Sequence, residues 1–163
     1  MYGGVSLAIY INGITQELLN MVRATDPGNA PEKPWLKWDQ LEGTEKVYRK
    51  LAYYLDQSRG APRTEEEEDK QPRTRFVVDI ISGTSAGGIN GVFLAKALAR
   101  KQKMDGLKKL WLSEGDLSKL LNDTKADDYR CDTGFEVKTP ESSLLNSKRM
   151  YCKLLEALKQ MEE

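Results

Sequence analysis

A short glycine-rich run between an apolar stretch and a helical pattern is the strongest constraint on how this chain folds. Residues 83–87 read Gly-Thr-Ser-Ala-Gly and match the pattern G-x-S-x-G. They follow the near-continuous apolar run of residues 76–81, which predicts a buried parallel strand, and they open a helical pattern over 86–101. A serine between a strand and a helix in this pattern is typical of a nucleophile elbow, a sharp turn that presents the hydroxyl. The sequence therefore predicts Ser85 as a nucleophile.

The residues around Ser85 favour this geometry. Gly83 and Gly87 allow the strand and the helix to approach each other closely. The backbone N–H of Ala86 is expected at a helix N-terminus, where it can stabilise an oxyanion. Gly3 and Gly4, ahead of the first helical pattern, are candidates for further N–H donors because glycine lets the backbone approach a substrate closely.

Two other interpretations of this turn stay open, a phosphate-binding turn and a turn that serves packing alone. A glycine-rich turn that opens a helix can hold a phosphate. No lysine follows Gly88, however, and no G-x-G-x-x-G occurs in the chain. The nucleophile elbow is therefore the favoured interpretation.

The chain contains no histidine, which excludes a complete Ser-His-Asp triad within it. A carboxylate can act as the base instead, if desolvation brings its pKa toward neutrality. The chain's own aspartates are weak candidates for that role. Asp79 is expected to be a buried structural partner on the strand, Asp105 is expected to cap a helix, and Asp132 lies in a polar loop.

Most of the remaining chain reads as helix. Helical patterns are predicted over residues 5–23, 42–57, 86–101, 107–112, 117–121 and 147–161. The first pattern has an apolar stripe at Leu7, Ile11, Ile14, Leu18 and Val22, and the second has one at Val47, Leu51, Tyr54 and Leu55. Residues 27–38 are a proline-rich loop, and residues 59–74 are a charged, solvated loop that is expected to be disordered. The run 76–81 has no second strand of similar quality to pair with, apart from a weak ladder near 134–137, so the chain reads as part of a larger α/β domain.

Composition narrows the class of protein. Lys and Arg number 25, as do Asp and Glu, so the net charge is zero and nucleic-acid binding is not supported. The acidic run at residues 65–69 reads as a solvated surface rather than a metal site, and no metal or cofactor is predicted. Cys131 and Cys152 are interpreted as reduced thiols. No run is long and apolar enough to span a bilayer, and no signal peptide is recognised, so a cytoplasmic or membrane-peripheral location is expected.

The residues around the elbow resemble the patatin-like phospholipases, and within that family a patatin-related bacterial branch. The most specific part is the stretch 79–91, Asp-Ile-Ile-Ser-Gly-Thr-Ser-Ala-Gly-Gly-Ile-Asn-Gly. The stretches 3–8, 110–117 and 143–145 are similar to the same branch, and the match covers nearly the whole chain. Two departures are visible: the glycine loop has Tyr2, Ser6 and Leu7 at family positions for glycine, a basic residue and glycine, and the family's Asp-Gly-Gly or Asp-Gly-Ala turn is missing.

The resemblance implies an α/β, three-layer patatin-like fold with a parallel-type central sheet. Residues 1–163 would form an incomplete, helix-rich N-terminal portion of that domain. It implies a lipid acyl hydrolase with a Ser-Asp dyad, in which Ser85 is the nucleophile and Gly3 and Gly4 belong to the oxyanion loop. Its substrate would be a phospholipid or another acyl ester met at a membrane surface, without a cofactor.

A second hypothesis follows from the missing aspartate. It describes a catalytically incomplete chain that binds lipid or protein. Because the predicted sheet is nearly empty, self-association or a partner chain that completes the sheet is expected. Trp35 and Trp38 with their neighbouring lysines are candidates for membrane contact.

Overall fold

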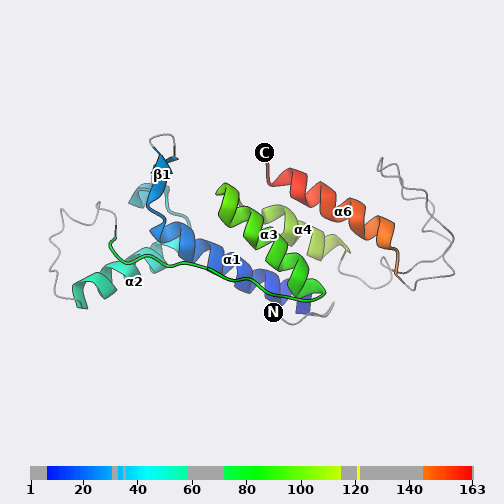
Figure 1. The fold of residues 1–163 in the computed structure, drawn as a ribbon, viewed down its shortest axis with the longest axis horizontal. Helices are drawn as coiled ribbons and strands as arrows, with labels where there is room; N and C mark the ends of the chain where they lie inside the picture. The colour runs from blue at the N-terminus through cyan, green and yellow to red at the C-terminus, as the bar shows by residue number, and fades with distance from the viewer. Residues whose placement is uncertain are drawn as a thin grey trace. The chain divides into compact units, whose positions relative to one another are not determined.

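The computed structural model of the chain describes residues 7–30, 33–34, 36–58, 72–114, 121 and 145–162. Five α-helices make up most of these residues. The chain divides into two compact units, which we call the elbow unit, Met1–Gly13 with Ser82–Glu163, and the hairpin unit, Ile14–Ile81. Figure 1 shows the order of the elements along the chain.

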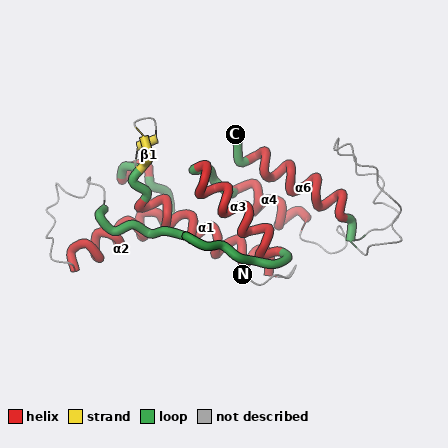
Figure 2. Tube along the Cα trace, viewed as in Figure 1, coloured by secondary structure: helices red, strands yellow, loops and turns green. Residues whose placement is uncertain are grey.

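The hairpin unit is built from the larger part of helix α1 (Ala8–Thr25) and from helix α2 (Glu45–Ser58). Between them lie the strands β1 (Gly28–Ala30) and β2 (Lys33–Pro34) and the short 3-10 helix η2 (Trp38–Gln40). The two strands pair antiparallel, with Gly28 opposite Pro34 and Ala30 opposite Lys33. The proline-rich segment predicted as a loop therefore contains a small hairpin (Figure 2).

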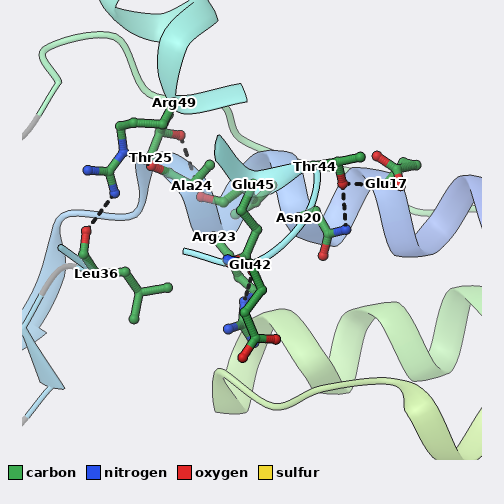
Figure 3. A network of polar contacts seen from close by, with 11 residues as sticks. Glu17, Asn20, Arg23, Ala24, Thr25, Leu36, Glu42, Thr44, Glu45 and Arg49 are labelled. Carbon is green, nitrogen blue, oxygen red and sulfur yellow. Dashed lines mark hydrogen bonds and ion pairs between the residues drawn. The ribbon is translucent and has the colours of Figure 1, made fainter. Parts of the chain in front are cut away.

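A buried arginine joins the elements of the hairpin unit. Arg49 of α2 is fully buried, and its Nε donates to the carbonyl of Ala24 in the last turn of α1. Its Nη2 donates to the carbonyl of Leu36 at 2.7 Å (Figure 3). A cation at the C-terminal end of a helix interacts favourably with the helix dipole, and the donors satisfy carbonyls that the helix leaves unpaired. Arg49 therefore ties α2 to both the end of α1 and the segment before η2.

Polar contacts continue along the same two helices. Arg23 donates to Glu45 at 2.8 Å, and Asn20 donates to Thr44 at 3.0 Å (Figure 3). The Tyr48 hydroxyl donates to Glu17 at 3.0 Å. Burial, followed by the hydrogen bond and the negative charge of Glu17, raises the pKa of Tyr48 above its usual value.

The faces that α1 and α2 bury differ from the predicted apolar stripes. In α1 the buried face includes Ala8, Ile11, Thr15 and Leu19, whereas Leu7 and Ile14 of the predicted stripe are exposed. In α2 the inversion is larger, because Glu45, Arg49, Ala52, Tyr53 and Asp56 are buried and Val47, Leu51 and Tyr54 are exposed. Hydrogen bonds to buried partners make this inward polar face possible.

The elbow unit consists of the start of α1 and of helices α3 (Ala86–Arg100), α4 (Asp105–Glu114) and α6 (Ser147–Gln160). Helix α4 packs on α6 so closely that a Cβ on Gly106 would lie 3.2 Å from the carbonyl oxygen of Ala157. Arg149 donates to Glu114 at 2.8 Å, and Lys96 donates to the Leu158 carbonyl at 2.7 Å. The core is apolar and is formed by Phe93, Leu94, Ala97, Met104, Leu107, Leu110, Trp111, Cys152, Ala157 and Met161.

The prediction of an α/β fold with a parallel-type central sheet is wrong. Most of the described residues are helical, their one ladder is β1 with β2, and a single isolated bridge joins Leu121 to Leu145. Residues 76–81, predicted to be a buried parallel strand, pair with no strand among the described residues, and Val77 and Ile80 are exposed. A parallel strand needs a neighbour to accept and donate its backbone hydrogen bonds. The prediction of a buried strand at this apolar run is therefore wrong.

Several other predictions concern local features. The ends of the five helices, α4 included, lie within a few residues of their predicted ranges. Cys152 is buried and disulfide-bonded, so its interpretation as a reduced thiol is wrong. Cys131, the acidic run 65–69, the ladder near 134–137 and residues 117–120 lie outside the described residues, as does the loop 59–74 up to residue 71.

Candidate active site at the Ser85 turn

Ser85 adopts a backbone conformation that few residues other than glycine adopt. Its φ is 50° and its ψ is −128°, between the extended residues 74–84 and the first residue of α3, Ala86. Such a conformation costs about 1–3 kcal/mol for a residue with a side chain, and it concentrates at functional positions. A strained serine at an abrupt change from extended chain to helix is the geometry of a nucleophile elbow. The side chain of Ser85 is exposed at this turn.

Gly83 permits the sharpness of the turn. A Cβ built on Gly83 would lie 2.5 Å from the carbonyl oxygen of Gly87 and 2.9 Å from the backbone nitrogen of Gly88. A Cβ on Gly88 would lie 3.2 Å from the carbonyl oxygen of Gly83. The extended segment and the first turn of α3 therefore approach within a distance that excludes a side chain at Gly83. The backbone of Gly87 is the atom group that Gly83 approaches, so the close packing expected of Gly83 is present at this turn.

The first turn of α3 leaves backbone donors beside Ser85. The helical hydrogen bonds begin at the N–H of Gly88, which donates to Thr84, and at the N–H of Ile89, which donates to Ser85. The N–H of Ala86 precedes this ladder and is one of the helix's initial donors without an intrahelical acceptor. It stands one residue after Ser85, at the positive end of the helix dipole. This is the position that the sequence predicts for an oxyanion donor.

A buried asparagine pair supports the turn at Ser85, and the sequence pattern did not predict it. Asn90 of α3 is fully buried, and its Nδ2 donates to the carbonyl of Ala86 at 2.9 Å and to that of Ala8 at 3.4 Å. Its Oδ1 accepts from Nδ2 of Asn12 in α1 at 3.2 Å. These contacts tie the first turn of α3 to the first turns of α1 inside the elbow unit. The one signal in the sequence is an asparagine beside the apolar stripe of α3.

The structure brings no catalytic base to Ser85 within its described residues. The Ser85 side chain does not cap α3 and makes no hydrogen bond to a carboxylate there. Asp79 is exposed rather than buried as predicted, and Asp105 is the exposed first residue of α4. Asp132, Gly3 and Gly4 lie outside the described residues. In the same part of the chain, no cluster of three or more histidine, cysteine or acidic side chains is arranged to hold a metal ion.

Comparison with known proteins finds a protein that is similar in sequence to this chain. No protein-family model matches it, and no solved structure matches it. The chain is 32% identical over 158 residues, 97% of its length, to a protein of Mycobacterium tuberculosis named "Uncharacterized membrane protein Rv3479". The chain spans 12% of the length of that relative. None of the helices in the described residues is long and apolar enough to cross a membrane.

Proposed function

We propose that this chain carries the nucleophile of a serine acyl hydrolase that acts on phospholipids or other acyl esters. The observation that carries the proposal is the conformation of Ser85, with its positive φ, between an extended segment and a helix N-terminus. The exclusion of a side chain at Gly83 supports it, because the first glycine of G-x-S-x-G then serves the turn. The resemblance of residues 79–91 to the patatin-like phospholipases supports the lipid substrate class.

The proposed reaction has two steps. The Ser85 Oγ attacks the ester carbonyl carbon, its proton passes to a carboxylate base, and the N–H of Ala86 donates to the oxyanion. Collapse of the tetrahedral intermediate breaks the ester bond, and the leaving alcohol takes up the proton. Water then attacks the acyl-enzyme with the same base, which releases the fatty acid and restores Ser85. In a chain without histidine the base is a carboxylate, supplied from outside the described residues or by another chain.

The name of the mycobacterial relative supports a membrane setting for this reaction. That protein is named a membrane protein. We therefore propose that the chain meets its acyl substrate at a membrane surface. The relative is much longer than this chain, so its own activity adds nothing further to the proposal.

A second candidate function is a binding module without catalysis. The observation that favours it is the absence of a carboxylate at Ser85 among the described residues, together with a chain that has no histidine. In that case the elbow is retained as a structural turn, and the chain binds lipid or a protein partner.

The experiment that separates the two uses covalent labelling and hydrolysis together. The full chain is treated with a fluorophosphonate probe and, separately, with a short-chain chromogenic ester and phospholipid vesicles. Labelling and hydrolysis that disappear in Ser85→Ala and persist in Ser82→Ala would support the proposal. Ser82 is a matched control because it is an exposed serine three residues before the turn.

Two results would contradict the hydrolase proposal. Hydrolysis unchanged in Ser85→Ala would remove Ser85 from the reaction. A folded wild-type chain that neither reacts with the probe nor hydrolyses either ester would favour the binding module.

A further inference from the structure

Helix α2 carries a stripe of apolar side chains that are exposed to solvent. Val47 is 63% exposed, Leu51 is 43% exposed and Tyr54 is 67% exposed. Their spacing of four and three residues places them on one face of the helix. The predicted core stripe of this helix is therefore an outward surface, and large exposed apolar patches mark binding sites.

The acidic side chains of α2 are buried, on the side of the helix opposite the apolar stripe. Its two carboxylates, Glu45 and Asp56, are 4% and 3% exposed. Glu45 is paired with Arg23 at 2.8 Å, and Asp56 accepts from the backbone N–H groups of Arg73 and Thr74, each at 2.8 Å. Helix α2 therefore contributes no negative charge to its outward surface.

Cationic and aromatic side chains border the apolar stripe. Lys50 is exposed, Lys46 is half-buried, and their ammonium groups lie 5.8 Å and 6.0 Å from the centroid of the Trp38 ring. Lysine combines an apolar stem with a charged end, and tryptophan and tyrosine concentrate where an apolar phase meets water. The segment before α2 adds Asp39 and Glu42, which are exposed, together with Lys37.

We propose that this surface, formed by Trp38, Lys46, Val47, Lys50, Leu51 and Tyr54, docks the chain on an anionic phospholipid surface. We call it the docking face. Its apolar side chains would enter the boundary of headgroups and acyl chains, and its lysines would stay at the level of the lipid phosphates. An apolar helix face with lysines at its border is the pattern of helices that lie in a membrane interface.

A second copy of the chain fits this surface less well. Pairing two docking faces brings Lys46 and Lys50 of one copy toward those of the other, and α2 itself offers no exposed carboxylate to balance them. The exposed carboxylates of Asp39 and Glu42 belong to the segment before the helix. Like charges brought together oppose association. An anionic membrane supplies both the negative charge and the apolar phase that the face lacks.

The proposal extends the proposed hydrolase function but stands on different residues, so the two can fail separately. Membrane binding is measured with the full chain carrying Ser85→Ala as well as with the wild-type chain. Equal binding of the two is expected, because the docking face contains no part of the Ser85 turn. If the chain binds vesicles but hydrolyses no ester, only the hydrolase proposal is contradicted.

The test is flotation of the full chain with vesicles of phosphatidylcholine, with and without phosphatidylglycerol. Binding is expected to the anionic vesicles and to fall with added salt. The double variant Lys46→Gln/Lys50→Gln is expected to bind about 30-fold more weakly, since each lysine near an anionic surface adds about a fivefold factor. The variant Val47→Ser/Leu51→Ser/Tyr54→Ser is also expected to lose binding, and circular dichroism checks that each variant stays helical.

The matched control is Lys108→Gln/Lys109→Gln, which removes two exposed lysines from α4. This control is expected to bind as the wild-type chain does. An equal loss in the control, or equal binding to neutral and anionic vesicles, would overturn the proposal. So would absence of vesicle binding by a chain that forms a dimer which the triple serine variant dissociates, because the face would then be a protein interface.

Discussion

The carbonyl oxygen of Gly87 lies 2.5 Å from the position that a Cβ on Gly83 would occupy. No side-chain rotamer relieves this contact, because the backbone fixes the position of the Cβ and the Gly87 oxygen is itself a backbone atom. Gly83→Ala is therefore expected to force the turn open, with a loss of about 1–3 kcal/mol of unfolding free energy. Urea denaturation measures the loss, and the probe reactivity of Ser85 is expected to fall with it.

The control for this prediction is Gly13→Ala in α1. A Cβ at Gly13 would meet nothing within 4 Å, and the residue lies inside a helix. The same substitution is therefore expected to stabilise the chain by about 0.5–1 kcal/mol, because alanine favours helix over glycine. Similar losses at both positions would contradict the close approach at Gly83.

Strain at Ser85 predicts a difference between two substitutions of the same residue. Ser85→Gly is expected to raise the unfolding free energy by about 1 kcal/mol or more over Ser85→Ala, because only glycine adopts this conformation without strain. Both variants remove the hydroxyl, so neither is expected to react with the fluorophosphonate probe. Thermal or urea unfolding measures the difference, and equal stability of the two would argue against strain at the turn.

Asn90 is expected to be more sensitive to substitution than the half-buried Asn20. Asn90→Ala removes the hydrogen bonds that Asn90 makes with the carbonyl of Ala86 and the amide of Asn12 inside the elbow unit, so a loss of about 2 kcal/mol is expected. Asn20→Ala removes an exposed hydrogen bond to Thr44 and is expected to cost less than about 1 kcal/mol. Chemical denaturation of both variants provides the comparison, and equal losses would count against a buried network at Asn90.

Arg49 supplies a comparison between neighbouring cations of one helix. Arg49→Met keeps an apolar stem but removes the donors to the carbonyls of Ala24 and Leu36, and is expected to cost at least about 2 kcal/mol. Lys50→Met removes an exposed cation and is expected to change stability by less than about 0.5 kcal/mol. Unfolding free energies of the two variants test this, and the reverse order would contradict the inward orientation of Arg49.

The raised pKa of Tyr48 predicts a pH dependence of stability. The folded pKa lies above that of an ordinary tyrosine, about 10, so the contribution of the neutral phenol is complete below about pH 10. It is lost as the pH rises through the folded pKa, where Glu17 repels the phenolate. Unfolding free energies above about pH 9 are expected to fall less steeply in Tyr48→Phe than in the wild-type chain. Tyr10→Phe, at an exposed tyrosine, is the control and is expected to follow the wild-type curve.

The sequence predicted well what depends on neighbouring residues alone. Helix α3 begins at Ala86 as its pattern predicts, and the turn at Ser85 has the sharp geometry that G-x-S-x-G implies. Turn geometry of this kind is set by local sterics, and glycine at position 83 is required by an atom only four residues away. Local contacts of this type are present in any fold that contains the segment.

The tertiary structure decided which faces are buried and what holds the site. Apolar spacing places Val47, Leu51 and Tyr54 on one face of α2, but it does not say whether that face meets a core or solvent. That outcome depends on partners distant in the sequence, such as the carbonyls that accept from Arg49 and the amide that pairs with Asn90. The apolar run at 76–81 likewise forms no strand, because no partner strand lies beside it among the described residues. The sequence by itself determined the helices and the turn at Ser85, whereas burial and pairing, which are properties of several segments at once, were decided only by the tertiary structure.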